Sequence, residues 1–110
     1  MSTDDECRVR DLLLPHLMGQ LDDSSATLDV QEIEVVSRGR GFDVVLELLA
    51  YGERWRVRLP RDNSDSILFN GAPAPHVVRS VANMIRIHLF EWWHTKDRER
   101  RSAAMGERLA

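Results

Sequence analysis

Apolar and polar residues alternate most clearly over residues 53–59, where three large apolar side chains are separated by arginines. This period of two is typical of a strand with one buried face and one exposed face. Residues 42–50 alternate in the same way, and Tyr51-Gly52 between the two segments suits a two-residue hairpin turn. The pattern therefore predicts an antiparallel hairpin formed by residues 42–50 and 53–59.

The short turn also sets the register of this hairpin. It places Leu48 opposite Trp55 on one face and Glu47 opposite Arg56 on the other face. A shift of one residue would mix the two faces, so we expect this register to be well specified. Residues 28–37 predict a further strand before the hairpin, but several registers of that pair are equally compatible with the sequence.

Two segments show the apolar spacing of an amphipathic helix, and the stronger one covers residues 75–95. The weaker one begins with a capping box at residues 3–6 and keeps its helical spacing as far as Leu21. Pro15 lies within this segment and predicts a kink or a break. Residues 60–75 are rich in turn-forming residues and are expected to form a long loop.

This order of elements predicts an α+β fold of the type α-β-β-β-α, a three-stranded antiparallel meander with two helices packed on one face. We expect residues 1–95 to form a single α+β domain. Residues 96–110 are expected to form a charged C-terminal tail, either a helical extension or disordered. The order resembles that of double-stranded-RNA-binding domains. Residues 70–79 lack the lysine cluster that opens the second helix of that family, so the resemblance is one of topology.

The composition is that of an ordinary globular domain, with 110 residues, 43% hydrophobic and 30% charged. An acidic N-terminus and the lack of a long apolar run predict neither a secretory leader nor a membrane span. The single cysteine, Cys7, cannot form an internal disulfide, which favours a reducing, cytoplasmic location. All basic residues except Lys96 are arginines, which is typical of a GC-rich bacterial genome.

The net charge of −3 hides an acidic first half and a basic second half. Arginines that alternate along one strand are spaced about 6.6 Å apart, close to the spacing of phosphates in a nucleic acid. Nucleic-acid binding is therefore one alternative, through Arg54, Arg56, Arg58, Arg61, Arg98, Arg100 and Arg101. The other explanation is a cross-strand ion ladder with Glu47 and with Glu32 or Glu34, and we favour it because the chain as a whole is acidic.

Two groups of apolar residues fall on otherwise polar faces. One lies among the strand arginines, and the other lies on the polar side of the last helix. Mixed arginine and apolar character is typical of protein interfaces, so we expect a non-catalytic protein–protein interaction module acting as a homodimer. The predicted partner-binding residues are Val45, Leu49, Arg54, Arg56, Arg58, Ile87, Phe90 and Trp93. Whether the sheet face is open or covered by another segment stays open.

The sequence contains no nucleophile elbow, phosphate-binding loop or dinucleotide fingerprint. One cysteine cannot supply a paired-cysteine zinc site. We therefore expect no catalytic residue, no metal and no cofactor. A second alternative is a small-molecule pocket or an enzyme site near loop 60–75, built from Asp62, Asp65 and His76.

Overall fold

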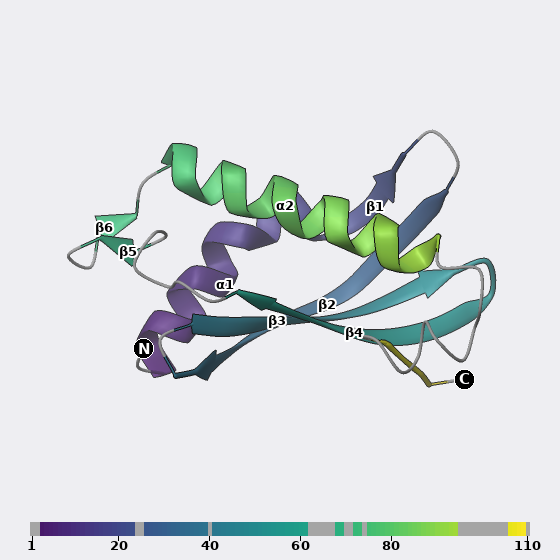
Figure 1. The fold of residues 1–110 in the computed structure, drawn as a ribbon, viewed down its shortest axis with the longest axis horizontal. Helices are drawn as coiled ribbons and strands as arrows, with labels where there is room; N and C mark the ends of the chain where they lie inside the picture. Colours follow the sequence, from purple (N-terminus) through teal and green to yellow (C-terminus); the bar gives the residue numbers. More distant parts are fainter. Residues whose placement is uncertain are drawn as a thin grey trace.

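The computed structural model describes residues 3–23, 26–39, 41–61, 68–69, 72–73, 75–94 and 106–109. In chain order, the elements within these residues are α1 (Thr3–Leu17), β1 (Gly19–Asp22), β2 (Thr27–Arg38), β3 (Gly41–Ala50), β4 (Glu53–Arg61), β5 (Leu68–Phe69), β6 (Ala72–Pro73), α2 (Pro75–Trp93) and β7 (Gly106–Arg108). Both helices lie on one side of an antiparallel sheet (Figure 1). The predicted α+β class is therefore confirmed.

The predicted three-stranded meander is wrong in its number of strands. In the described part of the chain, the main sheet has five strands in the order β1-β2-β3-β4-β7. The predicted strands form its centre, and the two short outer strands extend it at both edges. Because of these two outer strands, the fold differs from the α-β-β-β-α order of double-stranded-RNA-binding domains. A separate two-stranded hairpin, β5–β6, lies within the predicted loop.

The central hairpin has the predicted turn and register. Leu48 pairs with Trp55 and Glu47 pairs with Arg56. Both turn residues adopt a left-handed backbone, with φ of 50° at Tyr51 and 84° at Gly52. This is the conformation that a type I′ turn requires, and its twist matches that of the strands it joins.

A β-bulge between Val30 and Glu32 explains why the register of β2 could not be read from the sequence. The additional residue, Gln31, shifts the alternation of the strand by one position. As a result, Val30 before the bulge and Ile33 after it both face the core. Ile33 pairs with Leu46 in this register.

The first helix ends earlier than its apolar spacing predicted. Pro15 lies in its last turn, and Gly19 follows with a left-handed φ of 87°. A left-handed residue just after the last turn is a common way to end a helix, and glycine adopts it without strain. Leu21 therefore belongs to β1, where it pairs with Leu28, and not to the helix as expected.

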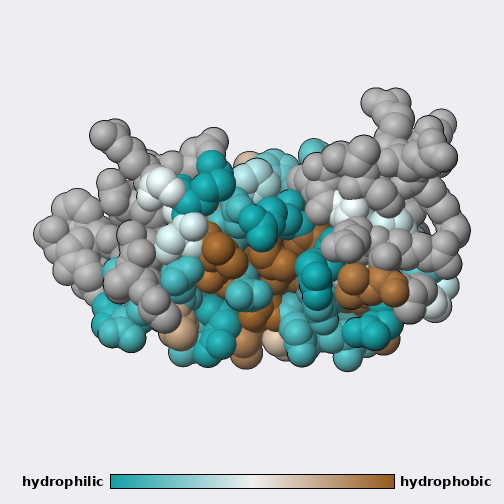
Figure 2. All heavy atoms as spheres, turned by 90° about the horizontal axis from the view of Figure 1, so that it is seen from below, coloured by the Kyte–Doolittle hydropathy of each residue, from teal (hydrophilic) through white to brown (hydrophobic). Residues whose placement is uncertain are grey.

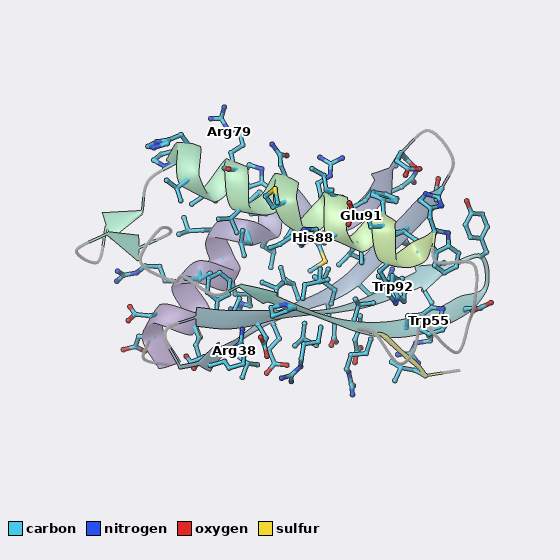
Figure 3. The ribbon with its side chains drawn as sticks, in the orientation of Figure 1. Arg38, Trp55, Arg79, His88, Glu91 and Trp92 are labelled. Atoms are coloured by element: carbon cyan, nitrogen blue, oxygen red, sulfur yellow. The ribbon has the colours of Figure 1, made fainter. Side chains whose placement is uncertain are left out.

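The core lies between the inner face of the sheet and the two helices. Leu13 and Leu17 of α1, one turn apart, are buried together with Ile85 and Leu89 of α2. Trp55 of β4 and Trp92 of α2 meet edge to face, with ring centroids 5.4 Å apart (Figure 3). None of the described helices combines the length and apolar character needed to cross a membrane.

Residues 106–108 form a strand, whereas the C-terminal tail was expected to be helical or disordered. This strand, β7, pairs with residues 55–57 of β4. Gly106 lies directly against Trp92, and a Cβ atom built on it would be 2.6 Å from Cζ2 of the indole. Only a residue without a side chain fits there, so glycine allows the strand to pair with β4 this close to Trp92. Residues 95–105 lie outside the described residues.

Candidate protein-binding surface

The outer face of the sheet is the face turned away from both helices. It consists of the side chains of β2–β4 that alternate with those of the core: Asp29, Glu32, Glu34, Val36, Arg38, Asp43, Val45, Glu47, Leu49, Arg54, Arg56 and Arg58. Within the described ranges, no helix or strand lies across it. Figure 2 shows this side of the molecule, with apolar atoms in the middle and polar atoms around them.

The charges of the outer face are sorted by strand. The charged positions of β2 between residues 29 and 34 are acidic, and those of β4 between residues 54 and 58 are basic. Three cross-strand rows therefore run from a carboxylate to a guanidinium group: Asp29–Leu49–Arg54, Glu32–Glu47–Arg56 and Glu34–Val45–Arg58. The central strand contributes an apolar residue to two of these rows.

Part of the predicted ion ladder is present. Arg56 Nη2 donates a hydrogen bond to Glu47 Oε1 at 2.7 Å. This hydrogen bond is the main reason that the pKa of Glu47 is below its ordinary value, and the charge of the same arginine adds to it. Of the two other acids considered for the ladder, Glu34 makes no ion pair with any described residue.

Asp43, on the central strand β3, links the two neighbouring strands β2 and β4. Its side chain is only 4% exposed, and its two carboxylate oxygens accept hydrogen bonds from different arginines. Arg38 Nε lies 2.9 Å from Oδ1, and Arg58 Nη1 lies 2.9 Å from Oδ2. Figure 3 shows Arg38 on the side of the sheet opposite to α2. These contacts hold two guanidinium groups, from β2 and β4, in fixed positions.

The apolar residues of the outer face differ in exposure. Leu49 is 37% exposed. Val45 is buried, because the charged side chains of the neighbouring strands flank it. It reaches the surface only in a shallow cavity of about 360 Å³, whose lining also includes Val36, Glu34 and Arg58.

The second predicted apolar patch, on α2, is not a single patch. Ile87 is 51% exposed, but Phe90 is only 8% exposed. The ring of His94 stacks on Phe90, and His94 Nε2 lies 3.1 Å from Asp23 Oδ2 at the end of β1. Trp93 packs on Tyr51, with ring centroids 5.7 Å apart. The expectation that Phe90 is exposed is therefore wrong.

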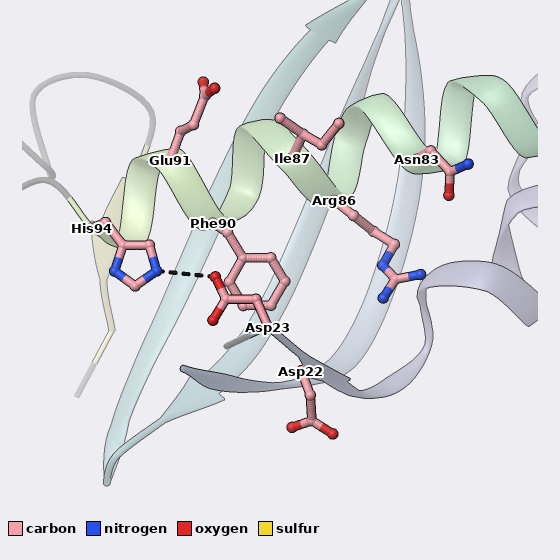
Figure 4. Close-up of a pocket in the computed structure, with 8 residues that line it drawn as sticks. All are labelled: Asp22, Asp23, Asn83, Arg86, Ile87, Phe90, Glu91 and His94. Atoms are coloured by element: carbon pink, nitrogen blue, oxygen red, sulfur yellow. Dashed lines mark hydrogen bonds and ion pairs between the residues drawn. The ribbon is translucent and has the colours of Figure 1, made fainter. Parts of the chain in front are cut away.

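A groove of about 770 Å³ runs beside this part of α2 (Figure 4). Its lining combines an apolar centre with charged side chains: Asp22, Asp23, Asn83, Arg86, Ile87, Phe90, Glu91 and His94. This groove could not be predicted from the sequence, because one of its aspartates ends β1, which was not predicted, and the other directly follows that strand. Among the described residues, no group of three or more His, Cys, Asp or Glu side chains is placed to hold a metal ion.

Several predicted residues cannot be assigned to a site. Asp62 and Asp65 of the possible pocket lie outside the described residues, as do Arg98, Arg100, Arg101 and the side chain of Arg61. His76 is exposed at the start of α2. The residues of the predicted pocket near loop 60–75, apart from His76, and those of the basic tail therefore lie outside the part of the chain that the structure describes.

The remaining arginines do not form a basic surface. Arg54, Arg56 and Arg58 share the outer face with five carboxylates, and two of the three arginines are hydrogen-bonded to them. Paired charges of this kind give little net attraction for a polyanion. The arrangement suits a partner that carries charges of both signs. Comparison of the chain with models of known protein families, with curated proteins and with solved structures finds no match.

Proposed function

We propose that this protein is a non-catalytic protein–protein interaction module that forms a homodimer through the outer face of its sheet. The observation that supports the proposal is the order of charges on that face. An acidic strand and a basic strand flank a central strand that carries Leu49 and Val45. A face with both signs of charge on opposite sides is complementary to a second copy of itself. The free thiol of Cys7 suits a reducing, cytoplasmic location.

The size of the face sets the expected strength of the dimer. Three strands, of which β4 has nine residues, cover about 30 Å by 14 Å, or about 400 Å². A standard protein–protein interface buries about 800 Å² on each partner, so this face is about half that size. We therefore expect a reversible dimer that forms at micromolar to near-millimolar protein concentration.

Sedimentation equilibrium over that concentration range tests the proposal. The wild-type mass should rise from the monomer value of 12.7 kDa toward twice that value. Leu49→Asp replaces an exposed apolar residue of the central strand with a carboxylate and should weaken the dimer by at least about tenfold. Ile87→Asp is the matched control, because Ile87 is also an exposed aliphatic residue, 51% exposed on α2.

Two results would contradict the proposal. One is a wild-type protein that stays monomeric at all concentrations tested. The other is dissociation by Ile87→Asp with no effect of Leu49→Asp, which would move the contact to α2. A monomer that binds nucleic acid with a steep dependence on salt would favour the alternative function of the arginines.

A further inference from the structure

We infer that the two copies of the chain meet face to face about a twofold axis that runs parallel to β3, so that the acidic strand β2 of each copy lies over the basic strand β4 of the other. This inference rests on the proposed dimer and specifies its arrangement. It follows from the order of acidic, central and basic strands on the outer face, together with the symmetry of a homodimer.

Two twofold arrangements bring the outer faces together with their strands aligned. An axis parallel to the strands places β2 of one copy over β4 of the other. Each cross-strand row then faces the same row of the second copy. Asp29 then lies opposite Arg54 of the second copy, and Glu34 lies opposite Arg58 of the second copy. Opposite charges face each other along both sides of the contact, which favours association.

An axis perpendicular to the strands gives the opposite result. It places each strand over the equivalent strand of the second copy, so β2 faces β2 and β4 faces β4. Asp29 then lies opposite Glu34 of the second copy, and Arg54 lies opposite Arg58 of the second copy. Like charges facing each other across an interface are unfavourable, so the charge order excludes this arrangement.

The central strand fits the parallel axis, with one unfavourable row. Leu49 meets Leu49 and Val45 meets Val45, which buries the apolar centre of the face. Glu47 also faces Glu47, but each of these carboxylates already has a guanidinium partner in Arg56 of its own chain. Face-to-face sheets are separated by about 10 Å, which leaves room for the two ion pairs.

Charge reversal in the Asp29–Arg54 row tests the arrangement. This row is chosen because neither residue takes part in the pairs formed by Asp43 and Glu47. With the parallel axis, Asp29→Arg places an arginine of one copy opposite Arg54 of the other copy on both sides of the contact. Arg54→Asp places two aspartates there. Each single variant should weaken the dimer about tenfold, and the double variant Asp29→Arg/Arg54→Asp should restore it.

The outcomes separate this inference from the proposed function. If the wild type dimerises and each single variant binds more tightly, the perpendicular arrangement is favoured and this inference fails. If each single variant binds as tightly as the wild type, the contact does not include this row and the inference also fails. If the wild type does not dimerise, the proposed function fails as well. Thermal unfolding of each variant checks that a loss of association is not a loss of fold.

A cross-link provides a second, independent measurement. In a Cys7→Ser background, Leu49→Cys should be linked into a dimer by a bis-maleimide with a span of about 10 Å, because the parallel axis places the two copies of this residue opposite each other at about the distance between the sheets, beyond the reach of a disulfide. Ile87→Cys in the same background is the control and should remain largely monomeric. A cross-link that forms equally in both variants would overturn the inference.

Discussion

Asp43 is deeply buried and pairs with two arginines. The acid needs the arginines in order to stay charged in the buried site, whereas the arginines do not need the acid. A carboxylate removed from water is stabilised only while opposite charges compensate for its lost hydration. Its partners, Arg38 and Arg58, are about half exposed and remain hydrated without it. Removal of the arginines should therefore be more costly than removal of the acid.

We expect Arg38→Ala or Arg58→Ala alone to lower the free energy of unfolding by about 1 kcal/mol, because the other arginine stays in place. The double variant leaves Asp43 buried without its two arginine partners and should cost about 3 kcal/mol or more. Asp43→Asn should cost less than the double variant. Urea denaturation measures all four changes, and strictly additive losses for the two arginines would contradict this account.

The Glu47–Arg56 pair makes a prediction about pH. A carboxyl group with a lower pKa in the folded chain than in the unfolded chain adds stability above its unfolded pKa. That stability is lost as the pH falls through the folded pKa. Arg56→Ala should raise the pKa of Glu47 toward its ordinary value, because it removes the main cause of the lowered pKa.

A carboxyl NMR titration measures this shift. Arg54→Ala is the control, since Arg54 acts on Glu47 only through its charge and should change the pKa less. Equal shifts in the two variants would mean that the hydrogen bond is not the main cause. The Arg56→Ala variant should also lose less stability than the wild type when the solution is acidified.

At the scale of elements, β7 depends on one close contact. Gly106→Ala would bring a Cβ atom into the indole of Trp92, so we expect it to detach β7 from β4. The amide of Leu109, which donates to the Arg54 carbonyl at 2.8 Å, should then lose its protection from hydrogen exchange. Amides of the β2–β3 pair should keep theirs.

Gly52→Ala is the control for this variant. Gly52 has open space around it but a left-handed backbone, so alanine there strains the turn by about 1 kcal/mol without a clash. It should lower the protection of the whole hairpin and not of Leu109 alone. Full protection of Leu109 in Gly106→Ala would show that the contact with Trp92 does not hold the strand.

Elements defined by local patterns were predictable, and those defined by distant contacts were not. The register of residues 42–59 follows from a two-residue turn and a strict alternation, both of which are local. The bulge at Gln31 breaks that alternation, so the register of β2 stayed open. Leu21 has helical spacing from Leu17, and only the left-handed Gly19 assigns it to a strand. The strand at 106–108 depends on a tryptophan in another element.

At the scale of the whole molecule, the chain is a flattened body of 41 × 26 × 19 Å with both helices on one side of the sheet. The outer face was predictable in part, because alternation alone places Leu49 and the arginines of β4 together. The groove beside α2 was not, because it requires β1 to lie next to Phe90. A surface built from one hairpin can be read from the sequence, whereas a surface shared by distant segments cannot.

The proposed face-to-face dimer predicts how salt affects association. In the proposed dimer, ion pairs between the two copies line both sides of the contact, where solvent ions screen them. The dissociation constant should therefore rise about tenfold when the salt concentration increases from low to several times physiological. Sedimentation equilibrium in a sodium chloride series measures this change. A dimer that tightens with salt would point to a contact dominated by apolar residues.

The two-residue turn at Tyr51–Gly52 also has a consequence for the order of folding in time. It brings β3 and β4 together through the shortest of connections, so closing this hairpin costs little chain entropy. The edge strand β7 pairs with β4 only after the chain has passed through α2, and its closure spans a much longer loop. During refolding, amides of the central hairpin should therefore become protected first and Leu109 last.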